Sequence, residues 1–261
     1  MEKTDVMSEN ITYDKLLEGI SESNPGYYIR ALNFCQLLKY TIPPLYDCIG
    51  VKQNTYHKDD VYQHCLKALE ASEKLTENPL LRLAILLHDI GKPATKRVGT
   101  DKRIHFFGHE VIGAQLANQY LIKLEFPKKD INYICKMIRY HQFRFSEELK
   151  YRKIKRWLQD LGKDAWRDII TLRYADRLGN SAKKNKPMST WYLDKLIEKA
   201  EEIIANQKIL FKEDLAVSDE EITKLVDSKG YSEIIFGLIA VLNKYPENNN
   251  RKWIMKYLSR Y

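Results

Sequence analysis

An apolar stretch in the first half of the chain ends in two ionisable residues. Residues 80–90 are apolar at nearly every position except the last few, where His88 and Asp89 stand, and Pro79 precedes the stretch while Gly91 follows it. Proline is favoured in the first turn of a helix and glycine just after its end. A helix that is apolar on almost every side is buried within a domain. The sequence therefore predicts a histidine and an aspartate at the end of a buried helix.

The remainder of the chain also favours helices. Glycine (11) and proline (8) are scarce among 261 residues, and no run of alternating apolar and polar residues indicates a strand. Apolar residues at helical spacing predict helices over about 27–39, 59–74, 80–90, 109–124, 128–141, 147–160, 163–179, 190–207, 219–228, 232–244 and 249–260. We expect residues 93–107 to form a loop. The predicted fold class is therefore all-α.

We expect three parts along the chain: an N-terminal segment over 1–26, a helical domain over 27–185 and a C-terminal helical extension over 186–261 that packs on it. The longest uncharged apolar run, residues 234–242, is much shorter than the roughly 20 residues that cross a bilayer. The N-terminus does not resemble a signal peptide, and none of the four cysteines forms a CxxC pair. These features predict a cytoplasmic protein with reduced thiols and no membrane partner.

Ionisable side chains interrupt the apolar stripes of other predicted helices. His64, His141 and Asp176 each lie three, four or seven residues from apolar positions of their own helix, which is the spacing of one helical face. Burying such a group costs several kcal/mol unless it is paired or bound to a cation. This cost is offset if the side chains converge with His88 and Asp89 on a metal ion. We therefore predict a metal site that several helices build together.

The types of side chain indicate which metals fit. Imidazole and carboxylate together suit Mn, Fe, Zn, Co, Ni or Mg, and the lack of cysteine ligands argues against a structural zinc site. His109, at the start of a predicted helix, could supply a further ligand. Each position also has an ordinary alternative, because a lone buried histidine is more often a hydrogen-bonded core residue. Asp176 could pair with either of its neighbours Arg173 and Arg177.

The motif His88-Asp89-Ile90-Gly91-Lys92, with His64 before it and Asp176 after it, resembles the HD superfamily of metal-dependent phosphohydrolases. Segments 50–64, 86–93, 107–114 and 172–178 resemble bacterial tRNA nucleotidyltransferases and poly(A) polymerases, and the similarity extends over roughly residues 27–260. It is strong over 50–115 and weaker after 180. The resemblance implies an HD-type helical bundle and hydrolysis of phosphomonoesters or phosphodiesters, usually on nucleotides.

The resemblance also implies which residues hold metal. The positions that match the core ligands are His64, His88, Asp89 and Asp176. His109 and His141 match histidines that hold a second ion in some branches of the superfamily. Because both are present, we expect two divalent ions.

One segment of the nucleotidyltransferases has no counterpart in this sequence. Those enzymes carry Gly-Ser followed by paired aspartates, whereas here Gly19 is followed by Ile20, and the acidic run after Ser218 has no preceding glycine. We therefore expect neither CCA addition nor poly(A) synthesis. The predicted function is hydrolysis of a nucleotide or a related small phosphoester. Two alternatives stay open: a phosphatase or 2′,3′-cyclic phosphodiesterase that acts on RNA or tRNA ends, and a non-catalytic RNA-binding module.

The metal-assisted reaction suggests roles for residues near the motif. Asp89 can bridge two ions or accept a proton from water. Lys92 could hold a phosphate as a point charge, or could be an ordinary cation at a helix end. Arg103 and His105 could contact the leaving group or base, or could belong to an exposed loop. Arg177 could reach phosphate or pair with the aspartate beside it.

A basic run with interleaved aromatic residues covers residues 150–157, and Arg139, Arg144 and Lys183-Lys184 add to its charge. This composition is typical of RNA-binding surfaces, where cations contact phosphates and rings stack on bases. The alternative is a solvated helix face that turns Ile154 and Trp157 inward. The formal net charge of +8 is compatible with an anionic partner such as a nucleotide or RNA.

Overall fold

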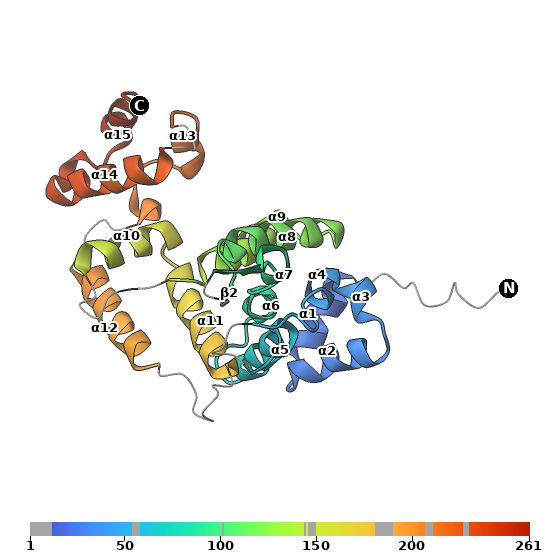
Figure 1. Ribbon diagram of the computed structural model, residues 1–261. Helices are drawn as coiled ribbons and strands as arrows, with labels where there is room; N and C mark the ends of the chain where they lie inside the picture. Colours follow the sequence, from blue (N-terminus) through green and yellow to red (C-terminus); the bar gives the residue numbers. More distant parts are fainter. Residues whose placement is uncertain are drawn as a thin grey trace. The chain divides into compact units, whose positions relative to one another are not determined.

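The computed structural model of this chain is almost entirely helical (Figure 1). It describes residues 12–53, 58–100, 102–143, 145, 150–180, 190–206, 211–226 and 230–261. Within these residues the only strands are two short ones that pair in a hairpin. The predicted all-α class is confirmed. No helix among the described residues combines the length and the apolar character that crossing a membrane requires.

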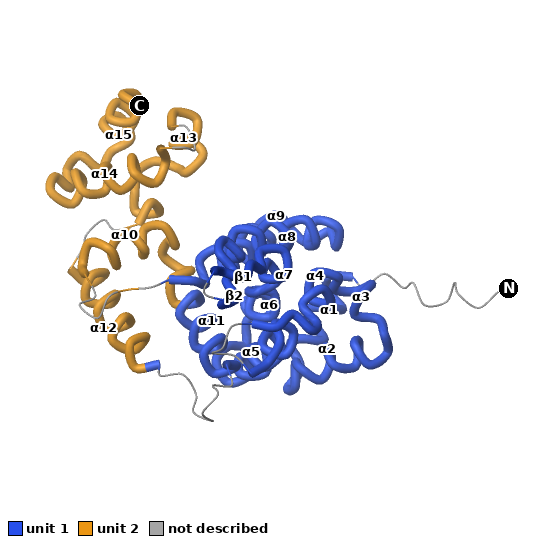
Figure 2. The backbone as a smooth tube through the Cα atoms, viewed as in Figure 1, with its two compact units in different colours: residues 1–143, 168–190 blue, residues 144–167, 191–261 orange. Residues whose placement is uncertain are grey.

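The chain divides into two compact units (Figure 2). Unit 1 comprises Met1–Phe143 and Asp168–Thr190, and unit 2 comprises Arg144–Arg167 and Trp191–Tyr261. The domains that we expect from the sequence follow a different partition, with a boundary between residues 185 and 186. That partition stays a prediction.

Unit 1 holds most of the regular structure. Its elements are α1 (Tyr13–Ser21), α2 (Pro25–Phe34), α3 (Leu38–Thr41), α4 (Pro43–Tyr46), α5 (Val61–Ser72), α6 (Pro79–Leu87), α7 (Lys92–Thr95), β1 (Arg97–Val98), β2 (Ile104–His105), α8 (His109–Lys123), α9 (Lys128–Tyr140) and most of α11 (Ala165–Gly179). Helix α6 packs against α1, α5 and α9, and every residue from Leu81 to Leu87 is buried. The apolar stretch of the sequence is therefore the central helix of unit 1, as predicted.

The start of α6 shows why this segment is helical. Asn78 caps the helix, and its side-chain oxygen accepts a hydrogen bond from the backbone N–H of Leu80 at 3.0 Å. Pro79 takes the first helical position, where its missing N–H has no cost. The one charged residue of the helix, Arg82, is buried and donates to backbone carbonyl oxygens that include those of Thr76 and Ser21. These bonds satisfy a cation that would otherwise be costly to bury.

Two glycines allow close backbone contacts in unit 1. A Cβ atom on Gly91 would lie 2.1 Å from the carbonyl oxygen of His109, so only glycine lets the end of α6 approach the start of α8. A Cβ atom on Gly179 would lie 2.5 Å from the backbone nitrogen of Ala68, where α11 meets α5. Both contacts lie within a few residues of the predicted metal ligands.

Several local elements differ from the sequence-based expectation. The helix predicted over 27–39 is two helices, because Gln36 adopts a positive φ of 58° and ends α2. The backbone N–H of Leu37 then donates to the carbonyl of Leu32 at 2.8 Å, the hydrogen bond of a Schellman turn. The predicted loop over 93–107 contains most of α7 and the β1–β2 hairpin. Helix α1 lies within residues 1–26, for which the sequence predicts no helix.

Unit 2 is helical as well. Its elements are α10 (Tyr151–Leu161), α12 (Trp191–Ala205), the 3-10 turn η1 (Lys212–Asp214), α13 (Asp219–Thr223), α14 (Tyr231–Lys244), the 3-10 turn η2 (Pro246–Asn248) and α15 (Arg251–Leu258). Residues of α13, α14 and α15 share one apolar core that includes Ile222, Leu238 and Ile254. Ser218 and Glu221 form a capping box at the start of α13, which ends earlier than the helix predicted over 219–228.

Candidate metal centre

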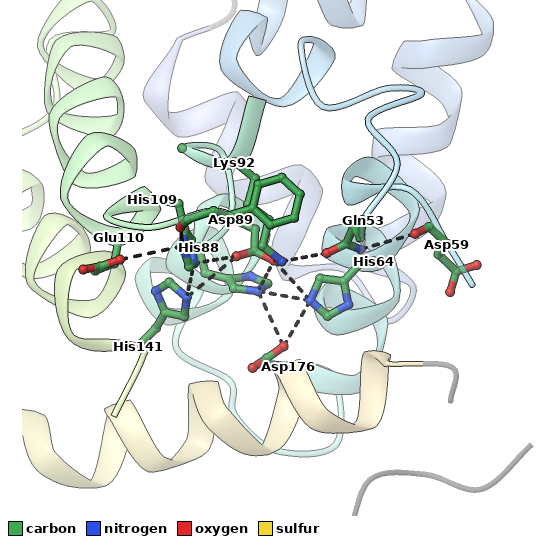
Figure 3. Close-up of polar contacts among 12 residues, drawn as sticks. Gln53, Asp59, His64, His88, Asp89, Lys92, His109, Glu110, His141 and Asp176 are labelled. Carbon is green, nitrogen blue, oxygen red and sulfur yellow. Dashed lines mark hydrogen bonds and ion pairs between the residues drawn. The ribbon is translucent and has the colours of Figure 1, made fainter. Parts of the chain in front are cut away.

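Unit 1 brings the six predicted metal ligands to one buried centre (Figure 3). They are His64 in α5, His88 and Asp89 directly after α6, His109 at the first position of α8, His141 directly after α9, and Asp176 in α11. All except Asp176 are buried, and the Asp176 side chain is 13% exposed. Side chains that lie far apart in the sequence therefore meet at one place, carried by or next to five helices, α5, α6, α8, α9 and α11.

One cluster joins His64, His88 and one oxygen of Asp89. The Nε2 atoms of the two imidazoles lie 3.2 Å apart, and Asp89 Oδ2 lies 3.4 Å from His64 Nε2 and 3.2 Å from His88 Nε2. Asp176 approaches the same two rings, with Oδ1 at 3.0 Å from His64 Nε2 and 3.7 Å from His88 Nε2. This first cluster could hold a metal ion.

A second cluster lies on the other side of Asp89. Asp89 Oδ1 is 3.3 Å from His109 Nε2 and 3.7 Å from His141 Nε2. The two imidazole Nε2 atoms are 3.3 Å apart. This second cluster could also hold a metal ion. Each carboxylate oxygen of Asp89 thus faces a different pair of histidines.

Three of the four histidines have their ring orientation fixed by the backbone. The Nδ1 atom of each lies 2.7 Å from the carbonyl oxygen three residues earlier, which belongs to Ile85 for His88, to Phe106 for His109 and to Ile138 for His141. A carbonyl oxygen only accepts hydrogen bonds, so Nδ1 carries the proton in each ring. In the neutral ring, Nε2 therefore presents a lone pair to the centre, which is the tautomer that binds metal.

The spacing of the donor atoms suits bound cations. Metal–nitrogen distances of about 2.0–2.1 Å place two neighbouring imidazole nitrogens on one ion about 2.8–3.4 Å apart, from octahedral to tetrahedral geometry. The two Nε2–Nε2 distances, 3.2 and 3.3 Å, fall in this range. The donors are imidazole nitrogens and carboxylate oxygens, the set that divalent ions of intermediate hardness prefer. The residues present therefore fit a centre for divalent cations.

The charges of the centre also favour a cation. Burial opposes ionisation of Asp89, but the His88 imidazole and the Lys92 ammonium outweigh it and hold the pKa of Asp89 well below its usual value. Burial likewise opposes ionisation of Asp176, but Arg173 and His64 hold its pKa well below the usual value. Both carboxylates are therefore ionised, and they attract positive charge to this pocket.

The pKa values of two imidazoles, those of His88 and His141, are shifted in opposite directions. Burial lowers the pKa of His88, but the carboxylates of Asp89 and Asp176 outweigh burial and raise this pKa from 6.5 to about 10. Burial and the neighbouring His88 hold the pKa of His141 well below its usual value. The pocket thus holds a positive charge at His88 while His141 is neutral. A divalent cation can take the place of that proton.

The comparisons with known proteins agree with this geometry. The family model of the HD domain matches residues 61–234. The chain belongs to the HD domain family. The match begins at α5, which carries the first ligand of the centre, and the resemblance noted in the sequence is confirmed. The family lies in a superfamily of metal-dependent phosphohydrolases, and HD domains bind divalent metals.

This HD domain protein is similar to two tRNA nucleotidyltransferases and to a multifunctional CCA protein. The chain is 33% identical over 155 residues to the A-adding tRNA nucleotidyltransferase of Deinococcus radiodurans, which covers 57% of this chain and 34% of that protein. It is 35% identical over 156 residues to the CC-adding tRNA nucleotidyltransferase of Thermus thermophilus, covering 59% and 35% respectively. It is 29% identical over 182 residues to the multifunctional CCA protein of Nitrosococcus oceani, covering 66% and 44%. The matched regions are less than half the length of each of these relatives.

Lys92 of the HD motif lies inside the centre. Its Nζ atom is 2.5 Å from Asp89 Oδ2 and donates to the side-chain oxygen of Gln53 at 2.7 Å. Gln53 is buried too, and its Nε2 atom donates to the backbone carbonyls of Asp59 and Asp60 at 3.3 Å. Sequence reasoning missed Gln53 because it precedes α5 and lies on no helical stripe. Its place just before the first ligand helix was the one available indication.

The predicted substrate-binding residues lie on different elements of unit 1 and differ in exposure. Arg103 is exposed on the β1–β2 hairpin, and His105 is the last residue of β2. Arg177 is half-buried in α11, next to Asp176. Asp176 forms an ion pair with Arg173, one of the two partners that the sequence left open. Arg144, Lys183 and Lys184, which the sequence adds to the basic run, lie outside the described residues.

Proposed function

We propose that this HD domain hydrolyses a phosphomonoester or phosphodiester of a nucleotide or a related small phosphate. The observation that carries the proposal is the position of Asp89, whose two oxygens face two separate histidine pairs. One divalent ion is assigned to His64, His88, Asp89 and Asp176. A second ion is assigned to His109, His141 and Asp89. Asp89 would supply one carboxylate oxygen to each ion.

The side chains of the centre perform defined tasks in this proposal. When bound, divalent ions supply a water molecule of lowered pKa and positive charge for phosphate oxygens. The backbone carbonyls hold the imidazoles of His88, His109 and His141 in the tautomer that binds metal. Burial of these rings keeps bulk water from competing for the ligand atoms.

We assign two tasks to Lys92. Its ammonium group orients Asp89 through Oδ2 and keeps that carboxylate ionised. An ammonium group has three donors, and two of them are directed to Asp89 and Gln53. The third is assigned to an oxygen of the substrate phosphate. Arg103, His105 and Arg177 are proposed to contact the substrate farther from the reacting phosphorus.

Metal analysis combined with a panel of phosphoesters tests this proposal. Purified protein should contain divalent metal and should hydrolyse p-nitrophenyl phosphate or bis-p-nitrophenyl phosphate with Mn²⁺ or Ni²⁺. His88→Ala and Asp89→Asn should abolish turnover, whereas Asp14→Asn, which changes an exposed carboxylate in α1, should not. Full activity in His88→Ala would refute the site. Metal-loaded wild-type protein that hydrolyses no phosphoester would refute the reaction.

RNA or tRNA ends are the second candidate substrate. The similarity to tRNA nucleotidyltransferases and to a multifunctional CCA protein favours this candidate. Rates on mononucleotides and on RNA that ends in a 2′,3′-cyclic phosphate separate the two. A larger kcat/KM on the RNA end would support this candidate, and a larger value on mononucleotides would refute it.

A non-catalytic RNA-binding role is the third candidate. In α10 the side chains of Tyr151, Arg152 and Lys153 are exposed, while Ile154 and Trp157 are buried. The helix therefore has a charged outer face, which RNA could contact. It also has a buried apolar face, as an ordinary solvated helix has. RNA binding through this face should weaken steeply as salt rises. An affinity that does not depend on salt would exclude it.

A further inference from the structure

In the short segment between the hairpin and α8, one side chain lies near the metal centre and the next one faces solvent. The ring of Phe106 lies near the centre, with Lys92 Nζ 5.5 Å from the ring centroid, and its backbone carbonyl accepts the hydrogen bond of His109. The next residue, Phe107, is 81% exposed. The phenylalanine that supports the centre is thus followed directly by one that faces solvent.

The exposed phenylalanine is held in a defined orientation. The rings of His105 and Phe107 stack, with centroids 5.1 Å apart and an angle of 9° between their planes. His105 ends β2, and Phe107 follows two positions later in the turn that precedes α8. The stack fixes one flat aromatic surface on the outside of unit 1. A preorganised ring loses less conformational freedom when a ligand binds to it.

This aromatic surface lies within reach of the metal centre. Phe107 and His109 are two positions apart, with Gly108 between them, so their Cα atoms are no more than about 7 Å apart. His109 Nε2 in turn lies 3.3 Å from Asp89 Oδ1. The phosphate and the base of a nucleotide are separated by a sugar, which spans a comparable length. A nucleotide with its phosphate at the centre can therefore extend its base to Phe107.

The hairpin next to this surface is positively charged. Arg97, Lys102 and Arg103 are exposed on it, and Lys96 precedes β1. Cations that lie together raise the local concentration of anionic ligands. Cationic and aromatic side chains in combination are typical of surfaces that bind nucleotides and single-stranded nucleic acids. The charge and the stacked rings therefore favour one class of ligand.

We propose that His105 and Phe107 form a stacking platform for the nucleobase of the substrate, so that Phe107 selects nucleotides over phosphoesters without a base. The proposal rests on the proposed function, because it places the substrate phosphate at the metal centre. It adds a specificity-determining residue and limits the substrate class to molecules that carry a base.

Two small probes isolate the contribution of the base. AMP and ribose 5-phosphate carry the same 5′-phosphate, and only AMP has a base. The readout is the ratio of their Kd values on Mn²⁺-loaded protein, or of their kcat/KM values where they are turned over. Stacking of one base is worth about 1–3 kcal/mol, so wild-type protein should prefer AMP by at least about fivefold.

Three variants of the full chain test the platform. Phe107→Leu removes the ring and should bring the ratio close to one, whereas Phe107→Trp restores an aromatic face and should restore the preference. Phe34→Leu is the matched control, since Phe34 is 90% exposed in unit 1 at the end of α2 and lies on a different segment. Its ratio should equal that of wild type.

The outcomes separate this inference from the proposed hydrolysis. A preference for AMP that Phe107→Leu leaves unchanged would overturn the platform, and so would wild-type protein that binds both probes equally or neither. If His88→Ala abolishes hydrolysis while Phe107→Leu keeps the full preference, the hydrolase stands and the platform fails. If no phosphoester is hydrolysed but Phe107→Leu removes the preference, the platform stands and the proposed function fails.

Discussion

His109 and His141 face each other through their Nε2 atoms, 3.3 Å apart, while the Nδ1 atom of each ring is bound to a backbone carbonyl. Each Nδ1 must donate, so in the neutral state two lone pairs point at one another. Such a pair is unfavourable in a buried pocket unless a positive charge lies between the rings. The same backbone bonds that create this repulsion also prepare the rings to share a cation. This relationship leads directly to predictions about metal.

Divalent metal should stabilise the folded chain. An ion that binds only the folded state adds about 2.7 kcal/mol when its concentration is 100 times its Kd. Thermal unfolding with and without Mn²⁺ or Zn²⁺, and after treatment with a chelator, measures this effect. We expect the midpoint to rise with metal and to fall with the chelator. Equal midpoints in all three conditions would contradict a metal centre in this pocket.

Single ligand substitutions should reveal two ions rather than one. His141→Ala removes a ligand of the second cluster only, so bound metal should fall from about two ions per chain to about one. His64→Ala should lower it to a similar level through the first cluster. Asp89→Asn should reduce both, because each oxygen of Asp89 faces one cluster. Elemental analysis of dialysed protein gives the counts.

The pattern across these variants is the decisive observation. If His141→Ala leaves the metal content unchanged while His64→Ala abolishes it, the second cluster does not hold an ion. If every variant loses all of its metal, the two clusters bind as a single unit. Either result would refute the assignment of two ions that bind independently, one in each cluster.

A methyl group at Gly91 should disrupt the centre although Gly91 contributes no ligand. In Gly91→Ala the new Cβ atom would lie 2.1 Å from the carbonyl oxygen of His109, and backbone must move to relieve the clash. We expect a loss of more than about 2 kcal/mol in the free energy of unfolding, together with weaker metal binding. Urea denaturation and metal titration measure the two effects.

Gly237→Ala is the matched control for this substitution. Its Cβ atom would meet Tyr257 Oη at 3.5 Å, an ordinary contact, and alanine favours the interior of α14. It should be neutral or stabilising by up to about 1 kcal/mol. A Gly91→Ala variant as stable as this control would show that the approach of α6 and α8 does not require glycine.

The sequence predicts the central helix well because its signals are local. The cap at Asn78, the proline after it and the apolar residues that follow all indicate the same helix. The break after α2 was not predictable in this way. Gln36 takes the left-handed conformation there, and glutamine carries no preference that would indicate it. Local sequence therefore reveals a helix end only where the residue at that position is specialised for it.

The candidate ligands were predictable because each histidine or aspartate interrupts an apolar pattern or joins a known motif. Their grouping was predictable only from the family resemblance, which assigns His109 and His141 to a second ion. Nothing in the spacing of His64, His109 and Asp89 indicates that one carboxylate lies between two histidine pairs. That arrangement depends on tertiary contacts at Gly91 and Gly179. At each glycine another backbone segment lies so close that a Cβ atom would clash with it.

Without metal, the protein should lose stability as the pH rises. The carboxylates of Asp89 and Asp176 overcome the effect of burial and raise the pKa of His88 from 6.5 to about 10. Between about pH 6.5 and 10, His88 therefore keeps its proton in the folded chain and loses it in the unfolded chain. This contribution is complete below pH 6.5 and is lost as the pH rises through about 10.

Urea denaturation in the presence of a chelator, between pH 6 and 10, tests this dependence. His88→Gln should flatten the curve, because it removes the titrating group. Bound metal should increase the free energy of unfolding more at higher pH, because the metal competes with the proton for the same ligand atoms. Metal-free wild-type protein whose stability rises over this range would contradict the raised pKa.

Removing the Lys92 ammonium should separate metal binding from turnover. Lys92→Met keeps the length of the side chain but loses its contacts with Asp89 Oδ2 and with the Gln53 amide oxygen. Groups that orient a metal ligand typically affect affinity or activity by about 10–100-fold. We expect kcat/KM for a phosphoester to fall by that amount. Metal content should stay at the wild-type level, because Lys92 supplies no ligand atom and its positive charge opposes a cation.

The control is Lys74→Met, which replaces an exposed lysine just beyond α5 and should match wild type in both measurements. A rise in KM at constant kcat would indicate that Lys92 acts by binding the substrate phosphate. A fall in kcat at constant KM would indicate that it acts by positioning Asp89. Unchanged kinetics in Lys92→Met would remove Lys92 from the mechanism, and loss of bound metal would show that its contact with Asp89 is needed to assemble the ligands.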